Sequence, residues 1–184
     1  MKTPAYFNLI LALFISTNAL SQVPPFEYVK TFGSTQRDIG WGTTVDQSGN
    51  SYTTGSFYDT LSFGSTTLIA NGSNLDFFVV KNDPQGNFVW AKNFGGLLDD
   101  FAFDIATDPS GNVYIAGRFR YQITIGGTQY TGNNSSTDGF VLKLDQNGNV
   151  QWFTPIGGRS TDNVGAIAVD ANGNSYVTGS FITS

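Results

Sequence analysis

The chain has 184 residues, of which 14 are acidic and 9 are basic, so its formal net charge is −5 at pH 7. This acidic balance argues against nucleic acid and anionic membranes as partners, because both are bound through basic surfaces. The sequence contains no histidine and no cysteine, which excludes a Ser-His-Asp triad, a cysteine nucleophile, an ordinary zinc site and any disulfide bond.

Residues 1–21 are predicted to be a cleaved signal peptide. Lys2 is followed by an apolar stretch, Ala5–Ile15, interrupted only by Asn8, and residues 19–21 (Ala-Leu-Ser) place small side chains at the two positions that a signal peptidase reads. The apolar stretch is about half of the roughly 20 residues needed to cross a bilayer, so membrane insertion is not expected. The mature chain is expected to begin at Gln22 and to be secreted or displayed at the cell surface.

From residue 26 onward the sequence repeats itself at a constant interval, which is the spacing between Gly33, Gly95 and Gly157. A repeat of this kind is one supersecondary unit that buries its apolar faces against its neighbours. Residues 22–184 are therefore expected to form one repeat domain. Its copies are residues 26–87, residues 88–149 and a partial third copy at 150–184.

Strand-like runs in each repeat are joined by Asp-x-x-Gly-Asn turns. In the first repeat one turn joins Ile39–Val45 to Tyr52–Phe57, and another joins Phe77–Val80 to Phe88–Trp90. Asp can accept hydrogen bonds from its own backbone, and Gly can adopt the left-handed conformation that short hairpin loops require. We therefore expect β-hairpin turns at all five copies. They begin at Asp46, Asp83, Asp108, Asp145 and Asp170.

Calcium binding is the alternative interpretation of these turns, because they place oxygen-bearing side chains at alternate positions. The candidate ligands are Asp145, Asn147 and Asn149 in one turn and Asp170, Asn172 and Asn174 in another. An EF-hand loop has its Gly at position six and a bidentate Glu at position twelve. Here Gly comes fourth, and the only glutamate of the chain is Glu27. We therefore expect neither a metal nor another cofactor.

The strand that follows the Gly-Gly corner of the second repeat alternates large and small residues. A period of two places Phe101, Phe103 and Ile105 on one face of the sheet, and the smaller residues between them on the other. The run Phe77–Val80, in contrast, is apolar at every position, which is typical of a strand covered on both faces. A short additional hairpin is expected at Leu61–Ile69.

Four or five strands in each repeat predict an all-β fold, and their repetition predicts a β-propeller. About two and a half blades are present. The chain is therefore expected to be a fragment of a larger propeller. Its terminal blades are expected to expose apolar faces, so that the fragment associates with itself.

A long ordered set of residues runs through the repeats. It contains Asp76-Phe-Phe-Val-Val-Lys81, Asp83-x-x-Gly86-Asn87, Trp90-Ala-Lys92 and Phe94-Gly-Gly96, followed by Asp100 and by Ile105 to Phe119. This set resembles the SBBP family of bacterial β-propeller repeats over essentially all of residues 26–184. The resemblance implies a secreted or cell-surface propeller of Gram-negative bacteria, often with a C-terminal sorting domain, and it brings no catalytic residues. The copies here are too few to close a ring, and no sorting domain follows within these 184 residues.

The residues that break the repeat are the candidate binding residues. Arg118, Arg120 and Tyr121 stand where the first repeat has Ser, Tyr and Asp. Residues that differ between blades can give a propeller a specific binding surface. This arginine–aromatic patch is therefore the predicted binding site.

Catalysis in this chain would have to rely on aspartates. Asp99, Asp100 and Asp104 form the densest acidic cluster, and a pair of carboxylates could act on a polysaccharide. However, Asp100 has counterparts at Asp38 and Asp162, one period away on either side. A repeated aspartate is typical of a corner that is fixed by hydrogen bonds from backbone amides.

Three functions stay open from the sequence. The leading one is a non-enzymatic secreted or cell-surface propeller that serves as a scaffold or binding module for protein or glycan. The second is an accessory propeller region of a larger secreted enzyme or adhesin. The third is a polysaccharide-active propeller enzyme that depends on aspartate.

Overall fold

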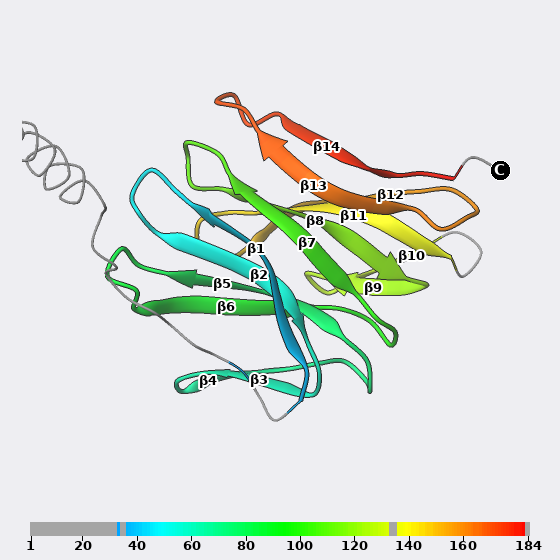
Figure 1. Cartoon of the computed structure of the whole chain (residues 1–184), viewed down its shortest axis with the longest axis horizontal. Helices are drawn as coiled ribbons and strands as arrows, with labels where there is room; N and C mark the ends of the chain where they lie inside the picture. Colours follow the sequence, from blue (N-terminus) through cyan, green and yellow to red (C-terminus); the bar gives the residue numbers. More distant parts are fainter. Residues whose placement is uncertain (1–32, 34–35, 133–135, 183–184) are drawn as a thin grey trace, which may run out of the picture.

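The computed structural model describes residue 33 and residues 36–132 and 136–182, and this part of the chain contains β-strands and no helix. The first blade is a four-stranded antiparallel sheet in the order β1-β2-β5-β6 (Figure 1). Its strands are β1 (Asp38–Val45), β2 (Ser51–Phe57), β5 (Asp76–Asn82) and β6 (Phe88–Phe94). The predicted signal peptide lies outside the described residues.

The second blade repeats the same sheet one period later, in the order β7-β8-β11-β12. Its strands are β7 (Phe101–Thr107), β8 (Val113–Arg120), β11 (Thr137–Leu144) and β12 (Val150–Ile156). A third sheet has two strands, β13 (Asn163–Val169) and β14 (Ser175–Ser180). Two four-stranded sheets and one two-stranded sheet confirm the predicted β-propeller repeats.

A small hairpin interrupts each complete blade between its second and third strands. It consists of β3 (Thr60–Phe63) and β4 (Thr66–Ile69) in the first blade, and of β9 (Gln122–Ile125) and β10 (Thr128–Thr131) in the second. The first of these confirms the additional hairpin expected at Leu61–Ile69. Its apolar residues Leu61, Phe63 and Leu68 pack with Phe78 of β5 in one buried cluster.

The blades stack face to face, with the inner strands β1, β7 and β13 in contact along the series (Figure 1). Phe77 of the first blade packs on Phe140 of the second, with ring centroids 5.1 Å apart. Phe77 and Val79 belong to the core between the two blades, whereas Phe78 and Val80 belong to the core on the other side of β5. The prediction that Phe77–Val80 is covered on both faces is therefore confirmed.

Polar side chains also connect one blade to the turn of the next. Lys81 Nζ and Trp90 Nε1, both in the first blade, donate to the backbone oxygen of Gln146 in the second blade, at 3.1 and 3.2 Å. Tyr114 of the second blade donates to the backbone oxygen of Gly173 in the third sheet at 3.1 Å. The turns of each blade thus fix its position on the preceding one.

The expected face assignment of the inner strand holds for Phe101 and Phe103, whose rings stack, but it is wrong for Ile105. A β-bulge between Ala102 and Asp104 adds one residue to β7, and this residue is Phe103. The bulge breaks the period of two, so Ile105 lies in the core with Ala102 rather than on the face of Phe101 and Phe103. Strands β1 and β13 carry the same register shift.

Candidate functional site

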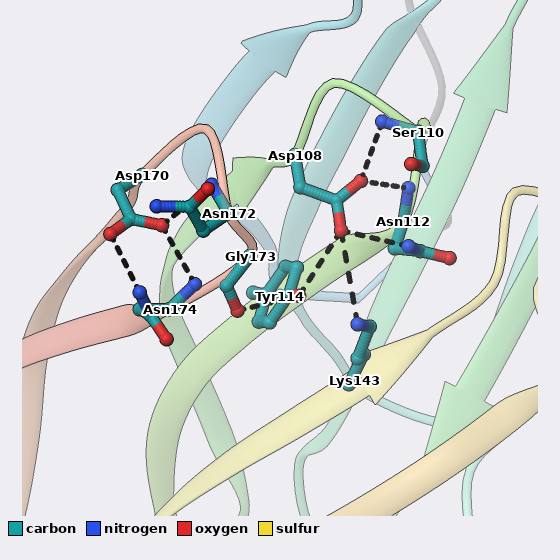
Figure 2. Close-up of polar contacts among 9 residues, drawn as sticks. All are labelled: Asp108, Ser110, Asn112, Tyr114, Lys143, Asp170, Asn172, Gly173 and Asn174. Atoms are coloured by element: carbon teal, nitrogen blue, oxygen red, sulfur yellow. Dashed lines mark hydrogen bonds and ion pairs between the residues drawn. The ribbon is translucent and has the colours of Figure 1, made fainter.

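Each Asp-x-x-Gly-Asn turn is held in shape by hydrogen bonds from its own residues to the carboxylate of its aspartate. Asp108 Oδ1 accepts hydrogen bonds from the backbone N–H groups of Ser110 and Asn112, at 2.9 and 3.0 Å. Its Oδ2 accepts from Asn112 Nδ2 at 2.7 Å and from the Tyr114 hydroxyl at 3.1 Å, and Lys143 Nζ lies 3.8 Å away (Figure 2). Burial opposes ionisation of Asp108, but the hydrogen bonds from Asn112, Tyr114 and Ser110 outweigh it and lower its pKa.

The two turns considered for calcium have the same arrangement. Asp145 Oδ1 accepts from the backbone N–H groups of Asn147 and Asn149, and its Oδ2 accepts from Asn149 Nδ2, all at 2.9 Å. Asp170 is held in the same way by Asn172 and Asn174 (Figure 2). These hydrogen bonds occupy the carboxylate oxygens that a calcium ion would need. Within the described residues, no three acidic side chains gather in a way that could hold a metal ion.

We therefore predict that calcium leaves the stability of the chain unchanged. Thermal melts with millimolar calcium and with a chelator should agree within about 2 °C. A chelator-dependent drop of about 5 °C, which corresponds to roughly 1–2 kcal/mol in a chain of this size, would contradict the structural role assigned to these turns.

A second set of aspartates fixes the corners between blades. Asp100 is fully buried, and its carboxylate accepts hydrogen bonds from the backbone N–H groups of Gly96, at 2.6 Å, and Arg120, at 3.1 Å. Asp162, one period later, accepts from Gly158 at 2.6 Å and Ile182 at 2.8 Å. These contacts are the corner bonds expected from the periodicity of Asp100.

The remaining members of the acidic cluster also accept backbone hydrogen bonds. Asp99 Oδ1 accepts from the N–H of Leu75 at 3.1 Å. Asp104 Oδ1 accepts from Ile105 at 2.9 Å, and its Oδ2 accepts from Ile167 of the third sheet at 2.8 Å. The three aspartates of the cluster therefore stabilise different backbone segments.

Burial of Asp100, and of Asp76 in β5, predicts that stability depends on pH. Burial raises the pKa of Asp100 to about 8 and that of Asp76 to about 6. The folded state therefore keeps protons that the unfolded state has lost, so the free energy of unfolding should fall as the pH rises from about 4 to about 8. The turn aspartates act in the opposite sense, because stability from their lowered pKa values, as at Asp108, is lost below about pH 4.

The measurement is the melting temperature of the chain at about pH 5 and about pH 9, with a higher value expected at the lower pH. The Asp100→Asn variant cannot titrate at this position, so its melting temperature should change less between the two conditions. Equal pH dependence in the variant and the parent would contradict this role of Asp100.

The non-repeating arginines line a cavity between the second blade and the third sheet. The cavity has a volume of about 290 Å³. Arg118 and Arg120 reach it from the end of β8, and Phe101 from the start of β7. The remaining lining residues are Asp99, Ser136, Thr137 and Thr161.

Aromatic stacking holds the guanidinium of Arg118 in this cavity. Its Cζ lies 4.9 Å from the ring centroid of Phe101 and 5.6 Å from that of Phe103. The two rings stack on each other, with centroids 5.8 Å apart. Among the described residues, the only ion pair within 4.0 Å joins Lys143 and Asp108. No described carboxylate therefore lies within 4.0 Å of the side-chain nitrogens of Arg118 or Arg120.

Comparison with known proteins agrees with this architecture. Residues 89–118 and 151–180 match the SBBP model, which describes a β-propeller repeat. The chain contains SBBP β-propeller repeats. The two matched stretches occupy equivalent positions in successive periods and run through the corners that hold Asp100 and Asp162.

Two relatives are similar to this chain over a small part of their length. The chain is 31% identical over 120 residues to an uncharacterized WD repeat-containing protein of Acanthamoeba polyphaga mimivirus, an alignment that covers 62% of the chain and 9% of the relative. It is 32% identical over 107 residues to the regulatory protein FlaEY of Caulobacter vibrioides, which covers 56% of the chain and 11% of the relative. The chain thus spans about a tenth of each relative. In its described part, no helix is long and apolar enough to cross a membrane.

Tyr121, the third predicted binding residue, occupies a position whose backbone conformation recurs between the two blades. Tyr121 has a φ of 66° and Asp59, its counterpart in the first repeat, has a φ of 58°. The backbone N–H of Tyr121 donates a hydrogen bond to the carbonyl oxygen of Ser136, and its carbonyl oxygen accepts one from the N–H of Gly132. The ring is exposed and does not line the cavity. Tyr121 therefore occupies a left-handed turn of the repeat, and its role in binding stays a prediction.

The five cavity residues other than the arginines also differ from their counterparts in the preceding repeat, and one of them is Asp99, which stands where that repeat has Arg37. Phe101, Ser136, Thr137 and Thr161 stand where the preceding repeat has Ile, Asn, Leu and Asp. Each difference is visible when one copy of the repeat is aligned with the next. Their proximity is not visible there, because they come from separate corners, from the starts of β7 and β11 and from the residue before β11.

Proposed function

We propose that this chain is part of a secreted or cell-surface, non-enzymatic β-propeller that serves as a binding module for protein or glycan. The observation that carries the proposal is the division between repeating and non-repeating polar residues. The repeating aspartates are bonded to their own turns and corners, whereas the non-repeating Arg118 and Arg120 line a cavity without a carboxylate partner among the described residues.

The chemistry of the chain supports a non-enzymatic role. It has no histidine and no cysteine, so catalysis would depend on carboxylates. Asp100, the central aspartate of the acidic cluster, is fully buried and accepts two backbone hydrogen bonds. A general acid must reach the oxygen of the bond that is cleaved, and a fully buried carboxylate does not.

A role as an accessory region of a larger secreted enzyme or adhesin is the second candidate. It is favoured by the coverage of the two relatives, of which the chain spans 9% and 11%. In that case the propeller would bind while another part of the protein carried out the chemistry.

The proposal is tested by export and by binding together. Expressed in a bacterial host, the full chain should be recovered outside the cytoplasm with a mass that begins at Gln22. The immobilised mature chain should then retain a specific protein or glycan from a panel of cell-surface components. Recovery with residues 1–21 still attached would contradict export, and a folded chain that retains nothing from the panel would contradict the binding role.

A further inference from the structure

The cavity between the second blade and the third sheet differs in charge from its equivalent one period earlier. There, Ser56 and Tyr58 stand in the places of Arg118 and Arg120. The equivalent of Thr161 is Asp99, whose carboxylate accepts the N–H of Leu75. The first site also has Arg37 where this cavity has Asp99. The lining therefore changes from one basic and one acidic side chain at the first site to two basic and one acidic side chain in this cavity.

The arginines keep their hydrogen-bond donors available for a ligand. The Cζ of Arg118 lies over the rings of Phe101 and Phe103. A cation–π contact needs no conventional hydrogen bond from the guanidinium, so its N–H groups can still donate to a ligand. The stack also restricts the rotation of the side chain before a ligand arrives, which lowers the entropic cost of binding.

Among the described residues that line the cavity, the only acidic one is Asp99, and one of its oxygens already accepts the Leu75 N–H. Two guanidinium groups against one carboxylate leave the lining with a net positive charge within an acidic chain. A guanidinium fork matches the planar geometry of a carboxylate, to which it can donate two parallel hydrogen bonds.

We infer that this cavity binds the carboxylate of a uronic acid unit in an acidic polysaccharide. The inference rests on the proposed binding function and names its ligand. At about 290 Å³ the cavity lies at the lower end of small-molecule sites, which suits one sugar unit. The hydroxyl groups of Thr137 and Thr161 line it beside the arginines and can both donate to and accept from sugar hydroxyls. An acidic peptide would offer these hydroxyls only its backbone amides, whereas a uronic acid carries several hydroxyl groups on the same ring as its carboxylate.

The test is a calorimetric titration of the full mature chain with an oligomer of galacturonic acid. The methyl ester of the same oligomer removes the charge and keeps the sugar ring, and a glutamate oligopeptide keeps the carboxylate and removes the ring. The variants Arg118→Ser and Arg120→Tyr introduce the residues that the first blade carries at these positions, so that the repeat fold is retained. Arg37→Ser, at an exposed corner outside the cavity, removes the same charge as Arg118→Ser.

The uronate oligomer should bind, the methyl ester should bind at least roughly tenfold more weakly, and Arg118→Ser should reduce affinity by a similar factor. Arg37→Ser should bind as the parent does. Tighter binding of the glutamate peptide than of the uronate would overturn the assignment to a sugar. Equal binding of acid and ester, or an unchanged affinity in both arginine variants, would overturn the cavity as the site while the proposed binding function stood. A folded chain that binds neither uronate nor any component of the cell-surface panel would overturn both.

Discussion

The Gly117→Ala variant is expected not to fold, or to lose more than about 3 kcal/mol of its free energy of unfolding. Gly117 lies in β8 opposite Ala102 of β7. A Cβ on Gly117 would overlap the carbonyl oxygen of Phe101 and would lie 2.9 Å from the Cα of Ala102. Both obstacles are backbone atoms, so no change of side-chain rotamer relieves them. Gly55 and Gly179 meet the same obstacle in the equivalent strands β2 and β14.

The matched control is Gly40→Ala, in the inner strand of the first blade. A Cβ at Gly40 meets nothing within 4 Å, so this variant should change stability by less than about 1 kcal/mol. Urea unfolding followed by circular dichroism measures both. If Gly117→Ala were as stable as Gly40→Ala, the backbone of Phe101 and Ala102 would have to leave room for a Cβ at position 117, which would contradict this prediction.

In solution, the chain is expected to associate with copies of itself through its third sheet. Tyr176 and Phe181 are 60% and 47% exposed, whereas their counterparts in the second blade, Tyr114 and Phe119, are fully buried. The difference arises because the sheet of β13 and β14 contains two strands where the complete blades contain four. An apolar surface of this kind, next to the free edge of β14, is typical of a surface that associates.

Light scattering at micromolar concentration should therefore report assemblies of two or three chains, or precipitation. Val177→Lys places a charge on β14 and should shift the chain toward the monomer. Ser65→Lys adds the same charge in the exposed turn between β3 and β4 and should leave the association unchanged. A monomeric parent chain with a cooperative melt would show that β14 does not act as an associating edge.

The sequence was sufficient to predict the blade architecture because its period, marked by Gly33, Gly95 and Gly157, is uninterrupted. The Asp-x-x-Gly-Asn turns located the hairpins. The recurrence of Asp100 in each repeat predicted that its carboxylate accepts hydrogen bonds from backbone N–H groups at the corner. The position of Ile105 could not be predicted in the same way. A β-bulge inserts one residue without leaving a separate composition pattern, and the bulge at Phe103 changes which side chains share a face.

The candidate site was only partly predictable. Arg118 and Arg120 were identifiable as departures from the period, but so was Tyr121, whose left-handed backbone depends on the turn that it occupies. The cavity itself depends on the approach of the corner at Thr161 to the end of β8. That approach follows from how the third sheet stacks on the second blade, which no short stretch of sequence encodes.

The claim that repeating aspartates are structural and non-repeating arginines bind ligand is tested most directly by comparing two variants in one titration. Asp100→Asn leaves a corner N–H without its acceptor and should lower the melting temperature by at least about 3 °C, yet bind the uronate oligomer as the parent does. The double variant Arg118→Ser, Arg120→Tyr should melt within about 2 °C of the parent and lose binding. The opposite result, in which Asp100→Asn abolishes binding without a loss of stability, would contradict the account.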